Sequence, residues 1–146
     1  MANLASTYRN QGRWKEAEQL EVQVIETRKT NLGADHPSTL TSMANLASTY
    51  SNQGRWEEAE QLFVQVMETS KTNLGADHPD TLTIMNNLAF TWKGLGRDAE
   101  AIELMKDCVQ YRTRILGAKH PDSLSSHLAL AAWKAEHSGT SGEHHQ

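Results

Sequence analysis

The sequence predicts an all-α fold, a solenoid of three helix pairs followed by a C-terminal capping helix. The main observation is a 42-residue repeat, because residues 1–42 and 43–84 differ at only 7 of 42 positions. Residues 85–126 keep the same skeleton, including Gly-Arg at 96–97 and His-Pro at 120–121. A fixed period of roughly 20–50 residues is typical of stacked supersecondary units that share one open-ended core. Such arrays generally bind other chains, so the repeat favours a binding role over catalysis.

The composition limits the range of possible functions further. The 146 residues fit one domain, and a net charge of −4 argues against a general nucleic-acid binder, which usually carries a basic face. No apolar run is long enough to span a membrane, and the N-terminus lacks a signal pattern. Cys108 is the only cysteine, which excludes an internal disulfide. We therefore expect a cytoplasmic protein without nucleic-acid or membrane partners, and a fragment of a longer array, since the chain starts inside a repeat.

Each unit is predicted to form two helices, as the pair that begins at Pro79 in the second copy illustrates. Pro79 suits the first position of a helix and Asp80 suits its positive end. Apolar residues then recur at three- and four-residue spacing, which is one helical face: Leu82, Met85, Leu88, Ala89 and Trp92. Gly94 and Gly96 end this helix, and a second begins near Arg97. The second helix is expected to turn inward Ala101, Leu104, Met105, Cys108, Ile115 and Leu116.

The same pattern, applied to the whole chain, divides it into an array and a tail. Seven helices are predicted, at 1–11, 14–32, 38–52, 56–74, 80–94, 97–116 and 122–137. They form a repeat array over residues 1–137, with repeats at 1–42, 43–84 and 85–126. The helix at 122–137 has no second helix after it, so we expect it to cap the apolar end of the third pair. Residues 138–146 are rich in Gly, Ser and His and are expected to be disordered.

These residues resemble a known repeat family. In the second copy the residues that carry the resemblance are Leu46-Ala47, Tyr50, Gly54, Ala59, Leu62-Phe63 and Val66. Their spacing is similar to that of the tetratricopeptide repeat (TPR), although the usual repeat has 34 residues. The longer period, with L-G-A-D-H-P-x-T-L at 32–40 and 74–82, resembles the kinesin light chain type. The near-identical copies are also similar to arrays at the C-terminus of fungal NACHT-type proteins. The resemblance implies a right-handed superhelix, with small residues where paired helices touch.

Three residues depart from the repeat pattern. Glu21 stands where Phe63 and Met105 stand in the later copies, so we expect the first pair to pack loosely. Asp98 takes the place of a tryptophan in the other copies. Lys134 replaces an aromatic residue in the last helix. These departures concern the ends of the array and leave the predicted fold unchanged.

In the family, the first helices of successive pairs line a concave groove that holds an extended or helical peptide. The resemblance places on this face Asn3, Asn45 and Asn87; Ser6, Ser48 and Phe90; Arg9, Ser51 and Lys93; and Thr41 and Thr83. An asparagine amide both donates and accepts, so it suits pairing with a peptide backbone of any sequence. The alternative is that each asparagine bonds the neighbouring helix and fixes the stack.

Phe90 and Lys93 are the members of this face that do not repeat. An aromatic ring beside a cation is a candidate anchor for an apolar or acidic side chain. The alternative is that Phe90 is an ordinary half-exposed aromatic residue.

Histidine also recurs once per unit, at His36, His78 and His120. A zinc ion needs ligands about 2 Å away, whereas stacking separates these histidines by about the width of a helix pair. We therefore predict no metal site. Each histidine is expected instead to cap the helix that the following proline opens.

At three further sets of equivalent repeat positions, which we call columns, the residues are expected to have structural roles. Trp14 and Trp56 follow Gly-Arg at a helix start and are expected to pack between the helices of a pair. Arginine recurs in the turn before each second helix, at Arg13, Arg55 and Arg97. Such an arginine either bonds the last carbonyls of the preceding helix or holds a carboxylate. Cys108 falls in an inward column, which predicts a small core residue.

No catalytic constellation is present, since the sequence lacks a phosphate-binding loop, a Cys–His pairing and a G-x-S-x-G motif. We therefore expect no enzyme activity and no cofactor. The leading hypothesis is a module that binds a peptide or protein segment in the groove. The rival is a self-assembling or ligand-sensing arm of a larger signalling protein, with a homodimer formed through the apolar N-terminal edge at Leu4, Tyr8 and Leu20.

Overall fold

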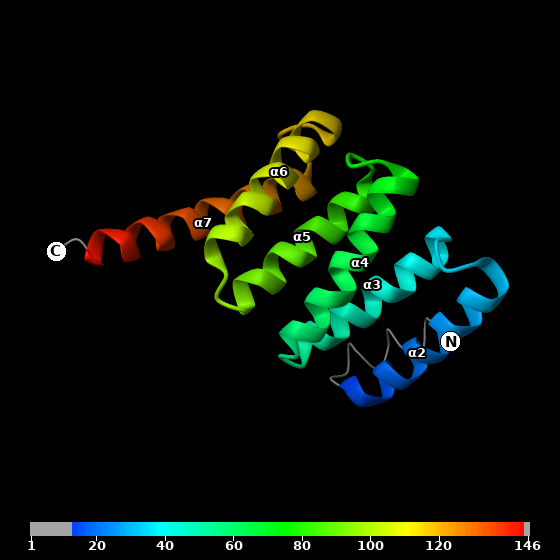
Figure 1. The fold of residues 1–146 in the computed structure, drawn as a ribbon. Coiled ribbons are helices and arrows are strands. Elements are labelled where there is room, and N and C mark those ends of the chain that lie inside the picture. The colour runs from blue at the N-terminus through cyan, green and yellow to red at the C-terminus, as the bar shows by residue number, and fades with distance from the viewer. Residues whose placement is uncertain (1–12, 145–146) are drawn as a thin grey trace. The chain divides into compact units, whose positions relative to one another are not determined.

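The computed structural model describes the backbone of residues 13–144 and the side chains of residues 13–137. This part of the chain contains α-helices and no strand (Figure 1). The helices are α2 (Trp14–Leu32), α3 (Pro37–Asn52), α4 (Trp56–Leu74), α5 (Pro79–Gly94), α6 (Asp98–Leu116) and α7 (Pro121–His144). The all-α prediction is therefore confirmed. The helix predicted at 1–11 lies outside the described residues.

The predicted helix bounds agree with the structure to within one residue, except at the end of the last helix. α7 continues to His144, whereas we expected it to end at 137 and a disordered tail to follow. The sequence after Pro121 contains no proline, the residue that most strongly interrupts a helix. Glycine and serine lower helix propensity without ending a helix.

The His-Pro pairs explain where the first helix of each pair begins. The Nδ1 atoms of His36, His78 and His120 each accept a hydrogen bond of 3.1 Å from the backbone N–H two residues later. That N–H belongs to the first helical turn, where four N–H groups lack an intrahelical partner. The proline between them has no N–H to satisfy and already holds a helical φ. The prediction that these histidines cap helices is thus confirmed.

The Gly-Arg pairs explain where these helices end. Gly54 has a φ of 77° and Gly96 a φ of 80°, which only glycine adopts at little cost. The reversal lets Arg55 N–H bond Tyr50 O at 2.8 Å and Arg97 N–H bond Trp92 O at 2.9 Å. These bonds satisfy carbonyls at the helix end and start the second helix one residue later.

The chain divides into two compact units, Met1–Ala76 and Asp77–Gln146. In the first unit, α3 packs against both α2 and α4. Ala47 of α3 and Ala59 of α4 are completely buried, so small residues do lie where these helices touch. Larger residues fill the remaining core of this unit: Ile25, Leu40, Met43, Leu46, Phe63, Val66 and Met67.

In the second unit, α6 packs against both α5 and α7. The core of this unit consists of Leu82, Met85, Leu88, Ala89, Ala101, Leu104, Met105, Cys108, Leu130 and Trp133. Cys108 is completely buried, as predicted, and burial raises the pKa of its thiol. The inward orientation predicted for Ile115 is wrong, because its side chain is 40% exposed near the end of α6.

Candidate functional site

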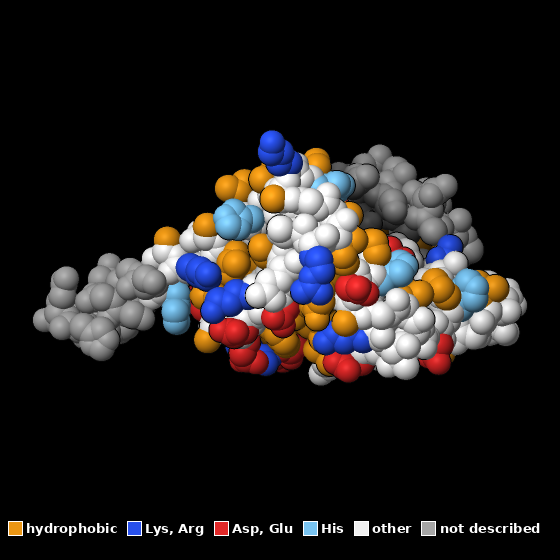
Figure 2. Space-filling view, turned by 90° about the horizontal axis from the view of Figure 1, so that it is seen from above, with side chains coloured by type: hydrophobic (Ala, Val, Ile, Leu, Met, Phe, Trp, Pro, Cys, Tyr) orange, Lys and Arg blue, Asp and Glu red, His pale blue; other side chains and the backbone are white. Residues whose placement is uncertain are grey.

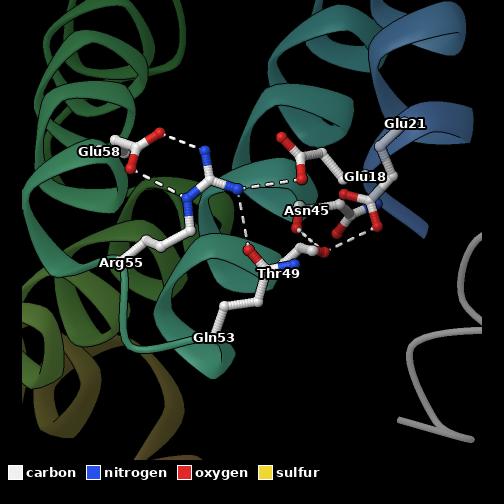
Figure 3. Close-up of polar contacts among 7 residues, drawn as sticks. All are labelled: Glu18, Glu21, Asn45, Thr49, Gln53, Arg55 and Glu58. Carbon is white, nitrogen blue, oxygen red and sulfur yellow. Dashed lines mark hydrogen bonds and ion pairs between the residues drawn. The ribbon is translucent and has the colours of Figure 1, made fainter. Parts of the chain in front are cut away.

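Four residues of the predicted binding face lie on α3, in the first unit: Thr41, Asn45, Ser48 and Ser51. Thr41, Asn45 and Ser48 are spaced by four and three residues, which places them on one side of the helix. Thr41 is exposed, and Asn45 and Ser48 are half-buried. The hydroxyl of Thr41 donates to the backbone carbonyl of Pro37 at 3.0 Å. Asn45 lies beside Thr49, whose hydroxyl donates to the Asn45 carbonyl at 3.1 Å (Figure 3).

The corresponding face of α5, in the second unit, carries Thr83 and Asn87. Thr83 is exposed and its hydroxyl bonds the carbonyl of Pro79 at 3.1 Å. Asn87 is half-buried, and its backbone carbonyl accepts from the hydroxyl of Thr91 at 2.9 Å. Within the part of the chain that the structure describes, no hydrogen bond engages the Asn87 side-chain amide.

Phe90 and Lys93 also lie on α5, but α7 contacts both of them. Phe90 is 46% exposed, and its ring meets that of Trp133 edge to face, with centroids 4.9 Å apart. The ammonium group of Lys93 pairs with Glu136 Oε2 at 2.8 Å and with Asp98 Oδ2 at 3.1 Å. The hydrogen bond that Lys93 donates to Glu136 is the main reason that the pKa of Lys93 is raised. The two proposed anchor residues are thus partly engaged within their own unit.

Sequence reasoning missed Trp133 and Glu136 as partners of this face. They are three residues apart on α7, which is the spacing of one helical side. Glu136 is 60% exposed and Lys93 is 25% exposed, so water screens the pair. A solvated ion pair of this kind contributes only about 0.2–1 kcal/mol. A carboxylate on a ligand can therefore compete with Glu136 for Lys93.

Three other residues of the predicted face, Asn3, Ser6 and Arg9, lie outside the described residues. The same holds for Leu4 and Tyr8, on which the dimer hypothesis depends. The third residue of that edge, Leu20, is half-buried on α2.

The arginine of the turn between α3 and α4 binds side chains of its own unit (Figure 3). Arg55 donates to Glu18 Oε2 at 3.0 Å and to Gln53 Oε1 at 2.9 Å, and it pairs with Glu58 through two nitrogens. Its guanidinium also lies 4.3 Å from the centre of the Tyr50 ring. The bond from Arg55 is the main reason that the pKa of Glu58 is lowered. Of the two predicted roles, carboxylate binding is the one seen at Arg55.

Arg97 repeats this arrangement in the second unit. It bonds both carboxylate oxygens of Glu100, at 2.8 and 2.6 Å, and lies 5.1 Å from the centre of the Trp92 ring. These bonds lower the pKa of Glu100. The arginine row is therefore occupied by intramolecular carboxylates at both of these positions.

A buried arginine connects the second helix of one pair to the first helix of the next pair. The sequence analysis did not identify this contact. Arg112 of α6 is 6% exposed and donates to Ser126 Oγ of α7 at 2.6 Å. Arg28 of α2 makes the equivalent bond to Ser42 Oγ of α3, also at 2.6 Å. The same columns of the middle copy hold Ser70 and Ile84. Both positions change together between the first and second copies. This paired change was the sequence signal that could have revealed the contact.

On the face shown in Figure 2, acidic and basic side chains are intermixed. Among the described helices, none combines the length and the apolar character that crossing a membrane requires.

Comparison with known proteins identifies the repeat. The chain matches the family model of the tetratricopeptide repeat over residues 1–72 and 45–109. No curated protein matches it. The two matched ranges together cover well over half of the chain, which is enough to show the family.

Solved structures agree with this assignment. Nearly identical, kinesin light chain-like TPR repeats from Podospora anserina share 32% identity with this chain at a TM-score of 0.85, covering 90% of this chain and 63% of that one. A single-residue variant of the same protein gives 32% identity and a TM-score of 0.84, with 90% and 62% covered. BtubC (BKLC) from P. vanneervenii shares the fold at a TM-score of 0.81 and 23% identity, with 92% and 53% covered.

This chain spans less than two thirds of the length of these structures. TPR folds of this kind typically serve as non-enzymatic scaffolds for protein interactions. The repeat period, the His-Pro and Gly-Arg signals and the helix pairing agree with the family match. The chain therefore belongs to the tetratricopeptide repeat family and is of the kinesin light chain type.

Proposed function

We propose that this protein binds a segment of another protein through the polar faces of α3 and α5, the first helices of their pairs. The observation that carries the proposal is the Asn87 side chain, which is half-buried on α5 with no hydrogen bond to its amide among the described residues. Asn45 occupies the same column of the repeat on α3. A half-buried amide is partly fixed in orientation, so it loses little conformational freedom when a ligand binds.

The mechanism is capture of the ligand backbone. Each asparagine amide donates one hydrogen bond to a peptide carbonyl and accepts one from a peptide N–H, whatever the ligand side chains are. Thr41, Ser48 and Thr83 flank the two amides with small polar side chains, which leave room for a peptide to approach. Repeated backbone contacts of this kind provide affinity, and side-chain contacts provide selectivity.

Selectivity comes from Phe90 and Lys93, together with Arg9 from the first copy. An acidic ligand side chain displaces the exposed Glu136 from Lys93, whose ammonium group is charged at neutral pH with or without this partner. Asp98 remains as the second partner of Lys93. The preferred ligand is therefore an acidic segment with an apolar residue that packs on the open part of Phe90.

The exchange at Lys93 predicts the effect of one substitution. Glu136→Gln removes the competing charge and should strengthen binding of an acidic peptide by up to about fivefold, since an exposed pair contributes no more than about 1 kcal/mol. Isothermal titration with acidic and neutral versions of one peptide measures this gain. Weaker binding of the acidic peptide to Glu136→Gln would contradict the proposed exchange.

Selection from a peptide-display library tests the proposed function itself. The wild-type chain should enrich a common motif, and the Asn45→Ala/Asn87→Ala variant should lose that enrichment. Asn31→Ala is the matched control, because it removes an exposed asparagine from α2, outside both proposed faces. Thermal unfolding of Asn87→Ala should change little, since the lost amide makes no hydrogen bond to described residues. Enrichment that persists in the double variant would place the binding surface elsewhere, and no enrichment by the wild type would favour assembly.

A further inference from the structure

A second surface with the character of a binding site lies between α6 and α7, and none of its lining residues belongs to the proposed peptide-binding faces. It is a hollow of about 680 Å³. Its lining residues are Val109, Gln110, Thr113 and Arg114 of α6, Ala118 of the turn, and Ser123, Leu124 and His127 of α7. We call it the α6–α7 groove.

Among the described residues no helix covers this side of α7, as a comparison of equivalent repeat positions shows. Leu124 is 47% exposed, whereas Leu40 and Leu82, which hold the same column on α3 and α5, are 4% and 1% exposed. Ala131 is exposed as well, although Ala47 and Ala89 in its column are completely buried. Leu128, one turn beyond Leu124, is 68% exposed. Leu124 and Ala131, which continue two of the core columns, thus face solvent.

The first unit shows what occupies such a groove. The counterparts of Val109, Leu124 and His127 are Ile25, Leu40 and Met43, which are at most 5% exposed. In that unit α4 packs on α3, and its buried face includes Phe63, Val66, Met67 and Ser70. In the second unit α6 covers α5 in the same manner. The occupant in both cases is a 19-residue amphipathic helix.

We propose that the α6–α7 groove binds an acidic amphipathic helix of the α4 type, supplied by a partner protein. In the first unit, the fold already buries a helix of this kind, α4, against the equivalent columns. The buried face of α4 has a fully buried alanine, Ala59, four residues before a large apolar residue, Phe63. Arg114 and His127 line the groove and no carboxylate does, which favours acidic residues beside the apolar stripe. The α4 sequence itself has four glutamates and one lysine. Helices commonly bind grooves through apolar anchors at this spacing.

A labelled peptide of the α4 sequence, residues 56–74, is the probe that tests this proposal. Fluorescence anisotropy should show saturable binding to the full chain with a Kd below about 1 mM. Leu124→Glu should weaken binding at least about tenfold, because it places a charge at the centre of an apolar contact. Ser125→Glu adds the same charge to the same turn of α7 on another side and should leave binding unchanged. A peptide with Phe63→Glu should not bind.

Several outcomes would overturn the proposal. One is the absence of saturable binding to the wild-type chain. Another is binding that Leu124→Glu leaves intact, as expected if the peptide merely displaces the chain's own α4. A third is concentration-dependent self-association that Leu124→Glu abolishes while the peptide fails to bind, because the occupant would then be a second copy. Circular dichroism of each variant checks that the helices are retained, which the exposure of Leu124 and Ser125 leads us to expect.

Discussion

At the scale of single residues, Glu21 is the most unusual member of the core. It is 4% exposed in a column that later copies fill with Phe63 and Met105. The hydroxyl of Thr49 donates to Glu21 Oε1 at 2.9 Å (Figure 3). We expected loose packing around this residue, whereas the structure buries the carboxylate and gives it a hydrogen bond. Burial of a charged group carries a desolvation cost that such a bond only partly offsets.

Glu21→Met should therefore stabilise the protein. Apolar replacement of buried charged groups is often neutral or stabilising, and we expect a gain of about 1 kcal/mol in the free energy of unfolding. Thr49 keeps its hydrogen bond to the Asn45 carbonyl, so its hydroxyl is not left unsatisfied. Urea denaturation at neutral pH measures the change. A loss of 1 kcal/mol or more would show that the glutamate is required where it stands.

At the scale of helices, the caps determine where the first helix of each pair begins. His36→Ala and His120→Ala each remove the acceptor for one N–H of the first turn. Each should lower the free energy of unfolding by about 0.5–2 kcal/mol, the usual effect of losing a cap. Asparagine at the same position supplies another acceptor and should recover most of the loss. Urea denaturation of the alanine and asparagine variants side by side measures both effects, and equal stabilities would show that the caps contribute nothing.

The Arg112–Ser126 contact makes a second prediction for helix packing. Arg112→Ser alone should cost about 2 kcal/mol or more, since it leaves the buried Ser126 hydroxyl and Asn86 amide with fewer partners. The double variant Arg112→Ser/Ser126→Ile copies the middle repeat and should recover much of that loss. A double-mutant cycle with Ser126→Ile gives the coupling energy. Additive effects would mean that the paired change in the sequence has no energetic basis.

The sequence predicted the helices well because their signals are local. Proline at helix starts, glycine at helix ends and the spacing of apolar residues all depend only on neighbours in the chain. Each of these signals also occurs more than once because the sequence is repeated. The contacts of α7 were harder to predict, because Trp133 and Glu136 belong to a partial copy of the repeat whose contacts cannot be inferred from the earlier copies. Lys93 and Phe90 were therefore expected to be open, whereas α7 partly engages both. The buried Arg112 and the half-buried Arg28 were missed because an isolated basic residue on a helix usually indicates a solvated face.

At the scale of the whole molecule, the side chains that stabilise the repeat array occupy different columns from those that we propose to bind a ligand. Core columns are filled by buried side chains on α3, α4, α5 and α6, while the polar columns of α3 and α5 keep asparagine at an equivalent position. Changes on the polar faces should therefore alter binding more than stability. The α6–α7 groove is a third type of surface, where core columns continue and no helix of the described part of the chain covers them.

The most direct test of the account is an NMR titration that follows the side-chain amide signals of Asn45 and Asn87. A peptide selected by display should shift both pairs of NH₂ resonances, because the proposal places both amides in hydrogen bonds to the ligand backbone. A scrambled peptide should leave them in place, and the amide of Asn31 should not move with either peptide. Saturable binding of the selected peptide without any shift at Asn45 and Asn87 would contradict recognition by these faces.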